Sequence, residues 1–188
     1  YILNLGLLAC VLPEHPLAKA WAKPAIEMCD RWLGEMVGPA GEWPESVANY
    51  AHVSATSLLL FAIAAKNAGL HDFIADPRMK RLMLYLAKQY TPPDPRSGGE
   101  RRPSLSLLPP SGRSAGGKAR VIPGLMAKAT AASDPAYSQV QQWSWLRSGS
   151  SLFVAVSSTG AERFAVDRSL PAATPDWGSD LFPQLGAI

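Results

Sequence analysis

The sequence predicts an all-α fold built from consecutive antiparallel helices. Apolar residues recur at helical spacing through most of the chain as far as Arg147. Proline, glycine and aspartate interrupt these runs at positions that suit helix ends. All but one of the connections are short, which favours packing between neighbouring helices. An array of this kind forms a bundle, a solenoid or an α/α toroid.

Three helices are expected in the first third of the chain. Residues 1–12 are apolar almost all round, as in a helix that is buried on most sides. Residues 17–37 carry large apolar side chains near helical spacing, with Pro24 as a point where the helix kinks or divides. A turn rich in glycine and proline follows. The third helix begins with Ser46 as N-cap and stops at Gly69, and its centre, LLLFAIAA, is apolar on every face and should be enclosed.

Two aspartate–proline pairs mark helix starts further along. Asp76 and Pro77 open a helix that reaches residue 90, because aspartate caps a helix start and proline is tolerated in the first turn. Asp134 and Pro135 open the last helix in the same way. The helix after Asp76 carries one apolar stripe, formed by Met79, Leu82, Met83 and Leu86.

The chain is expected to divide near residue 170. Residues 1–169 form the helical domain, and residues 170–188 form a proline-rich linker and, at residues 182–188, the first strand of a following β domain. Between the longer helices, residues 122–132 form a short helix, and residues 152–158 fit a strand or a short helix equally well. Residues 91–120 form a loop longer than compact domains use unless it is functional or disordered.

The composition and the two ends of the chain limit the kinds of protein that this sequence fits. The 188 residues are 47% hydrophobic and 18% charged, with a formal net charge of +3, which fits one domain or a piece of a larger protein. Because both ends fall within apolar runs, we interpret the chain as an internal segment. The opening apolar run is shorter than the ~20 residues of a membrane span, so no span is expected. Cys10 and Cys29 fit free thiols better than a disulfide, and the spacing of cysteine and histidine predicts no metal site and no cofactor.

The stretch GEWPESVANYAH, residues 41–52, gathers aromatic and acidic side chains where a turn meets a helix. In a structural interpretation Trp43 packs over the turn and Tyr50 is a half-buried helix aromatic. In a functional interpretation Tyr50 presents its hydroxyl near the helix start, which attracts anions, and transfers a proton. Glu45 would bind a sugar hydroxyl, orient a neighbour or favour the helix dipole. His52 points away from Tyr50, because residues two apart lie on different helix faces.

The long loop carries a local positive charge. Six basic residues lie within residues 96–120, opposed by Glu100 alone. Such a field suits an acidic glycan, and Arg101, Arg102 and Arg113 are the candidates to contact its carboxylates or sulfates. A solvated loop without a ligand remains the alternative. Nucleic acid is not expected as a partner, because no aromatic residues are interleaved with the basic ones.

Three segments occur in this order along the chain: GEWPESVANY, LLPPSGRS and the ending TPDWGSDLFPQLGAI. Together they resemble the helical domain of the heparinase II/III-like polysaccharide lyases, a family that includes oligoalginate lyases. GEWPESVANY is similar to the family's segment dG-x-x-x-E-s-x-x-Y. LLPPSGRS, residues 107–114, is similar to its loop segment lPp-x-GDs. The ending TPDWGSDLFPQLGAI resembles the family's passage into a β-sandwich. The order and distances of the three fit, so the resemblance covers the chain from about Leu17 onward.

The resemblance implies an incomplete α/α toroid followed by a β-sandwich, in a periplasmic or secreted protein. It also implies β-elimination of a uronate-containing polysaccharide. In such lyases an Asn or His neutralises the sugar carboxylate, a base removes the C5 proton, and a Tyr protonates the leaving oxygen. That tyrosine matches Tyr50, and Trp43 would stack on a sugar ring. The family's Asn/His pair would fall before Tyr1 and its β-domain His after Ile188, so this segment would hold one wall of the site and be inactive alone.

One departure from the family keeps other functions open. Arg113 stands where the family has an aspartate, which fits a different anionic substrate or a member without the usual activity. A non-catalytic glycan-binding toroid is therefore one alternative. A glycoside hydrolase on an α/α toroid is another, and it needs two carboxylates across the scissile bond. Glu42, Glu45 and Asp72 are the candidates, but their spacing forms no convincing pair.

Overall fold

The computed structural model describes residues 1–45, 50–89, 95, 121–152 and 166–177. Within these residues the chain forms six α-helices: α1 (Ile2–Val11), α2 (Ala18–Glu35), α3 (Tyr50–Asn67), α4 (Pro77–Lys88), α5 (Ile122–Thr130) and α6 (Pro135–Arg147). The predicted all-α class is confirmed for this part of the chain. The expected helix start at Ser46, the basic loop, most of residues 152–158 and the expected strand at residues 182–188 lie outside the described residues.

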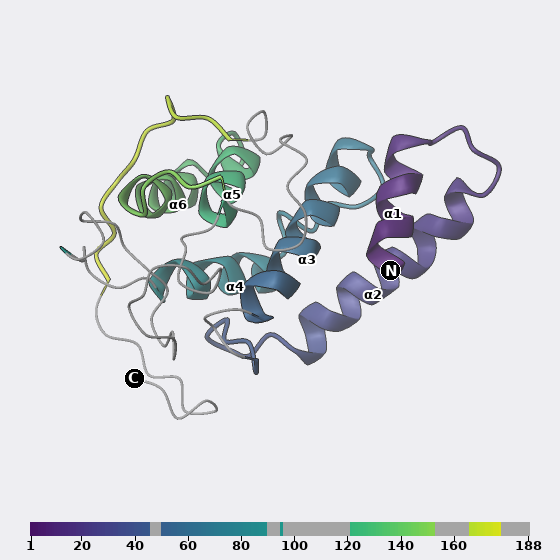
Figure 1. Cartoon of the computed structure of the whole chain (residues 1–188), viewed down its shortest axis with the longest axis horizontal. Coiled ribbons are helices and arrows are strands. Elements are labelled where there is room, and N and C mark those ends of the chain that lie inside the picture. Colours follow the sequence, from purple (N-terminus) through teal and green to yellow (C-terminus); the bar gives the residue numbers. More distant parts are fainter. Residues whose placement is uncertain (46–49, 90–94, 96–120, 153–165, 178–188) are drawn as a thin grey trace.

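The helices form an elongated arrangement with a helical pair at each end (Figure 1). Helices α1 and α2 pack against each other at one end, and α5 and α6 do so at the other. Helix α3 lies between the two pairs and contacts α1, α4 and α5, while α4 also contacts α2, α5 and α6. Helices α3 and α4 therefore connect the two pairs.

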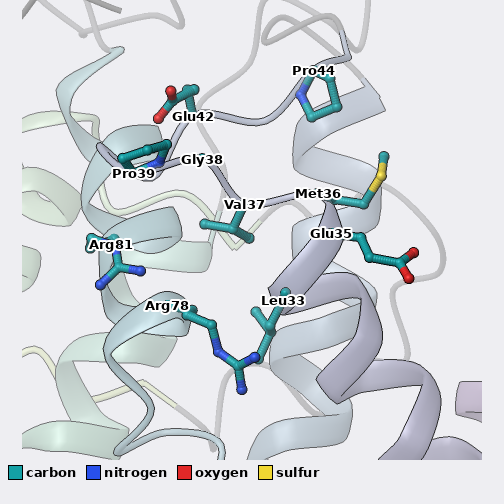
Figure 2. A pocket seen from close by; sticks show the side chains of 11 residues that line it. Leu33, Glu35, Met36, Val37, Gly38, Pro39, Glu42, Pro44, Arg78 and Arg81 are labelled. Carbon is teal, nitrogen blue, oxygen red and sulfur yellow. The ribbon is translucent and has the colours of Figure 1, made fainter. Parts of the chain in front are cut away.

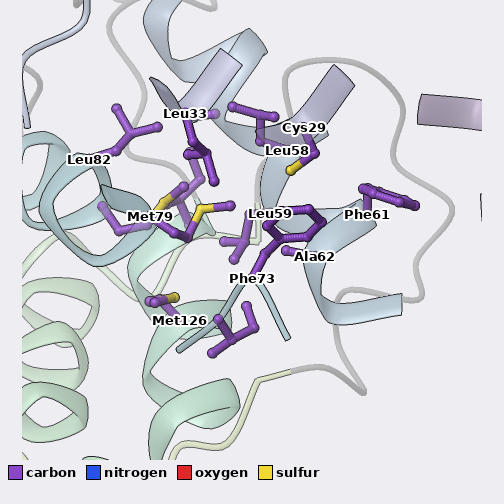
Figure 3. Packing of buried hydrophobic residues seen from close by; sticks show 14 of the residues in the cluster. Cys29, Leu33, Leu58, Leu59, Phe61, Ala62, Phe73, Met79, Leu82 and Met126 are labelled. Atoms are coloured by element: carbon purple, nitrogen blue, oxygen red, sulfur yellow. The ribbon is translucent and has the colours of Figure 1, made fainter. Parts of the chain in front are cut away.

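The core lies where α2, α3, α4 and α5 meet (Figure 3). Leu59 and Phe61 of α3, Met79 of α4 and Met126 of α5 are all fully buried there. Phe73, from the connection between α3 and α4, packs against Phe61 with ring centroids 6.2 Å apart. The expected stripe on α4 and the expected enclosure of LLLFAIAA on α3 are both confirmed, because no residue of either set is exposed.

Helix α1 buries one face only, so the expectation that it is buried on most sides is wrong. Leu3, Gly6 and Ala9 are buried against the neighbouring helices. Leu8 and Val11 point to the opposite side, and Val11 is 74% exposed. The physical reason is that α1 has partners on one side, α2 and α3. Among the described residues, no helix combines the length and the hydrophobicity that a membrane crossing requires.

Helix α2 continues through Pro24 without dividing. Its buried face carries mostly small side chains, which let α1 approach closely: Ala18, Ala22, Ala25, Cys29 and Leu33. Both cysteines are free thiols, as the sequence predicts. Burial raises the pKa of the Cys29 thiol to about 12, and the nearby carboxylates of Asp30 and Asp76 add to this shift. The thiol of Cys29 is therefore a neutral core group.

The two predicted aspartate caps are confirmed. The carboxylate of Asp76 accepts a hydrogen bond of 2.8 Å from the backbone N–H of Arg78 at the start of α4. The carboxylate of Asp134 accepts one of 3.3 Å from the N–H of Tyr137 at the start of α6. Asp76 also forms an ion pair of 2.6 Å with the guanidinium of Arg78, which reaches Asp30 of α2 at the same distance. The cap of α4 is thus also the polar link between α4 and α2.

Replacing Asp76 with alanine should lower the free energy of unfolding by about 1–2 kcal/mol at pH 7, because α4 loses its cap and Arg78 loses a partner. The side-chain hydrogen bond from Arg78 holds the pKa of the Asp76 carboxyl below its ordinary value. A lowered folded-state pKa stabilises the fold above the unfolded-state pKa of about 4, and this stabilisation disappears as the pH falls through the folded-state pKa. Urea unfolding of wild type and Asp76→Ala at pH 7 and at low pH measures the difference. Asp76→Asn keeps a capping oxygen and should lose less, and an alanine deficit that stays constant with pH would contradict the prediction.

A segment of twelve residues, 166–177, lies along α6, and we call it the α6 strap (Figure 1, yellow). The carbonyl of Asp167 accepts a hydrogen bond of 2.9 Å from Gln142 of α6, and the N–H of Ala173 donates one of 3.1 Å to the carbonyl of Gln139. Trp177 meets Trp143 of α6 edge-on, with ring centroids 5.9 Å apart. The linker expected from residue 170 therefore remains in contact with the helical domain up to residue 177.

Candidate functional site

The turn between α2 and α3 is held together by its own polar groups. The N–H of Gly41 donates to the carbonyl of Gly38, and the N–H of Gly38 donates to the carbonyl of Glu42, both at 2.9 Å. The side chain of Glu42 turns back and accepts a bond of 2.9 Å from the N–H of Ala40. Glu42 is only 4% exposed, so its carboxylate is fixed in place. The predicted turn is confirmed.

Trp43 follows this turn and enters the core, where it is 1% exposed. Its ring meets Trp32 of α2 edge-on, with centroids 6.4 Å apart. Its indole N–H donates a hydrogen bond of 2.9 Å to the carboxylate of Glu45. The expected stacking of Trp43 on a sugar ring does not fit this placement, because an enclosed ring has no free face. The structural interpretation of Trp43 fits instead.

Glu45 connects the turn to α3. Besides the indole of Trp43, its carboxylate accepts a hydrogen bond of 3.2 Å from the hydroxyl of Ser54 on α3. Of the three roles expected for Glu45, these contacts fit the orientation of a neighbouring side chain. The residue lies on the surface, so one side of its carboxylate also faces solvent.

Tyr50 is the first residue of α3, and its side chain is 61% exposed. His52, two residues further on, is fully buried on another face of the helix. The two side chains therefore point apart, as the sequence predicts. A phenol in this position is reachable by a ligand from solvent. Arg101, Arg102 and Arg113, the predicted basic partners, lie outside the described residues.

The carboxylates considered for a hydrolase are each engaged in structural contacts. Glu42 closes its own turn, and Glu45 binds Trp43 and Ser54. Asp72 forms an ion pair of 3.2 Å with Lys66 and accepts a hydrogen bond from the N–H of Ala75. Of the three, Glu42 lines the pocket described next, and Glu45 and Asp72 do not.

A pocket of about 560 Å³ lies beside the turn (Figure 2). It is bounded by the end of α2, by the turn itself and by one face of α4. Tyr50 does not line it. The lining residues are Leu33, Gly34, Glu35, Met36, Val37, Gly38, Pro39, Glu42, Pro44, Arg78 and Arg81.

Two arginines of α4 face this pocket, and they differ in their partners. Arg78 is held by the carboxylates of Asp76 and Asp30, whose hydrogen bonds raise the pKa of its guanidinium. In Arg81 the Nε atom is buried and has no hydrogen-bond partner within the described structure. No ion pair joins Arg81 to Glu42 across the pocket among the described residues. Of these two arginines, Arg81 is therefore the one with side-chain N–H donors left for a ligand.

Arg78 and Arg81 were not predicted as site residues, because their importance depends on a contact between α4 and a turn some forty residues earlier. A weak signal was present. The two arginines lie three residues apart in PRMKRLM, so they share a face of α4 next to the apolar stripe.

Comparison of this chain with protein-family models, with curated proteins and with solved structures finds no match in any of the three.

Proposed function

We propose that this chain is the helical part of a polysaccharide lyase that cleaves an acidic, uronate-containing glycan by β-elimination. The observation that carries the proposal is the exposed phenol of Tyr50 at the first residue of α3. It occupies the position at which GEWPESVANY resembles the tyrosine segment of the heparinase II/III-like lyases. The expected compartment, periplasmic or secreted, belongs to the same proposal.

An incomplete toroid is the arrangement we propose for the complete helical domain. Paired helices at each end, α1 with α2 and α5 with α6, are the repeating unit from which such toroids are built. The outer face of α1 supports the same idea, because Leu5, Leu8 and Val11 leave an apolar surface that a neighbouring helix would cover. A β-sandwich after residue 188 completes the proposed architecture.

In the proposed reaction a base removes the C5 proton of a uronate residue. The electron pair forms the C4–C5 double bond as the C4–O bond breaks. The hydroxyl of Tyr50 donates its proton to the leaving oxygen, which then departs as a sugar hydroxyl. The base and the group that neutralises the sugar carboxylate are assigned to other parts of the protein, in keeping with the resemblance.

The test uses the full-length protein with alginate, heparan sulfate and hyaluronan, and it follows the ultraviolet absorbance of the unsaturated product. On a substrate that is cleaved, Tyr50→Phe should lower kcat by about a hundredfold or more, because general acid catalysis contributes on that scale. The unfolding midpoint should not change, since the side chain is exposed. Tyr1→Phe is the matched control, because Tyr1 is also an exposed tyrosine. Wild-type rates in Tyr50→Phe would refute the role of this residue.

A non-catalytic glycan-binding domain is the second candidate. It is favoured by the pocket beside the turn, which has polar groups fit for binding but is not lined by Tyr50. Saturable binding of an oligosaccharide by the full-length protein without turnover would support it. A hydrolase has no comparable support, because its candidate carboxylates do not share this pocket: Glu42 lines it, and Glu45 and Asp72 do not. Products without a double bond would support a hydrolase instead.

A further inference from the structure

We propose that the pocket between α2, the turn and α4 binds one uronate sugar residue, with its carboxylate on Arg81 and a ring hydroxyl on Glu42. This inference takes the class of ligand from the proposed function but places it at a site that Tyr50 does not line. The site is therefore distinct from the one at which Tyr50 would act, and it can be tested separately.

Arg81 supplies the charge that recognises a carboxylate. Arg81 lines the pocket, and its Nε is buried without a hydrogen-bond partner in the described structure, so no carboxylate of the fold balances this cation there. Because protein atoms cover the Nε, we assign the ligand carboxylate to the Nη groups of Arg81. A guanidinium binds a carboxylate through two parallel N–H···O bonds, which gives both charge and geometry. Arg78 is less suited to this part, because its Nε and Nη2 already donate to the carboxylates of Asp76 and Asp30, which balance its charge.

Glu42 selects against a simple anion. Its carboxylate lines the same pocket, and only one of its oxygens is used, by the N–H of Ala40. Phosphate or sulfate would be repelled by this negative charge and by Glu35 on the rim. A uronate avoids the conflict, because it presents a carboxylate to Arg81 and a hydroxyl donor to Glu42. The opposite charges of the two side chains therefore point to a ligand that is both acidic and hydroxylated.

Size and apolar lining agree with a sugar. The volume of about 560 Å³ lies in the range of small-molecule sites. Apolar side chains complete the wall and can cover the C–H face of a sugar ring: Leu33, Met36, Val37, Pro39 and Pro44. Gly38 leaves the space that the Glu42 carboxylate occupies, because a Cβ at that position would meet this side chain.

The experiment is a calorimetric titration of the full-length protein with D-glucuronate and D-mannuronate, and with D-glucose, inorganic phosphate and glycine for comparison. At least one uronate should bind, and glucose should bind at least tenfold more weakly because it lacks the carboxylate. Arg81→Gln should weaken uronate binding at least tenfold and leave glucose unaffected. Tyr1→Phe, at an exposed tyrosine that does not line the pocket, should bind uronate like wild type. The proposed catalytic role is tested separately, by the absorbance of the unsaturated product. Absence of uronate binding, or phosphate or glycine bound as tightly as uronate, would overturn the proposal.

A second variant tests the same site in case Arg81→Gln does not fold. Gly38→Ala should push the carboxylate of Glu42 out of place and weaken uronate binding severalfold, because the side chain that it displaces has a flexible end. Gly69→Ala is the matched control, since a Cβ there meets no other atom. Equal uronate affinity in Gly38→Ala and Gly69→Ala would argue against the role of Glu42.

Discussion

Gly41→Ala is expected to lower the free energy of unfolding by about 3 kcal/mol, as the sum of backbone strain and overpacking. Gly41 has a φ of +91°, a conformation that residues with a Cβ rarely adopt. A Cβ at this position would also meet the backbone carbonyl of Arg81 on α4, which cannot move aside as a flexible side chain can. Urea unfolding followed by circular dichroism measures the loss.

Gly69→Ala separates the two contributions. Gly69 also has a positive φ, +66°, but a Cβ there would meet no other atom within 4 Å. It should therefore show the strain alone, about 1 kcal/mol. If both variants lose the same stability, the close contact of the turn with α4 does not contribute, and the account of how the pocket is positioned would be wrong.

Phe61→Ala should lower the free energy of unfolding by about 3–5 kcal/mol, the range for removing a buried aromatic ring. The ring of Phe61 joins three parts of the fold. It extends from α3, packs on Phe73 of the following connection, and fills the space beside Gly6 of α1. Its removal leaves a cavity that these neighbours cannot easily close. Denaturant unfolding at a fixed pH measures the change.

Leu70→Ala is the control for the loss of apolar surface without a cavity. Leu70 is 41% exposed just after α3, and its truncation should change stability by less than about 1 kcal/mol. A loss in Phe61→Ala no larger than in Leu70→Ala would mean that the contact between α1 and α3 is not maintained in solution.

Local chemistry allowed the helices to be predicted from the sequence. Asp76 and Asp134 cap helices as expected, because capping depends on residues two or three positions away. The apolar stripe of α4 is likewise a local pattern. Helix α6 is harder, because Gln141, Gln142 and Ser144 are fully buried and leave no clear apolar face to detect. The partner of Gln142 lies far along the chain, because the α6 strap accepts its hydrogen bond.

The candidate site was predicted less well than the helices. The exposure of Tyr50 agrees with the functional interpretation of GEWPESVANYAH, and the burial of His52 agrees with its position on another helix face. For Trp43 the sequence left two interpretations open, because a tryptophan beside a turn fits the core and the surface equally well, and its burial fits the structural one. The pocket could not be predicted, since it arises only when the turn meets Arg81 across a long separation in the chain.

The α6 strap sets an order for the local opening of this end of the molecule. Its hydrogen bonds to Gln139 and Gln142 run along the outside of α6, and the ammonium of Lys88, at the end of α4, lies 5.5 Å from the centre of the Trp177 ring. The strap must come away before α6 can leave α5. We therefore expect exchange of the α6 amides to be slowed by contacts with residues far along the chain, in a segment that has no regular structure of its own.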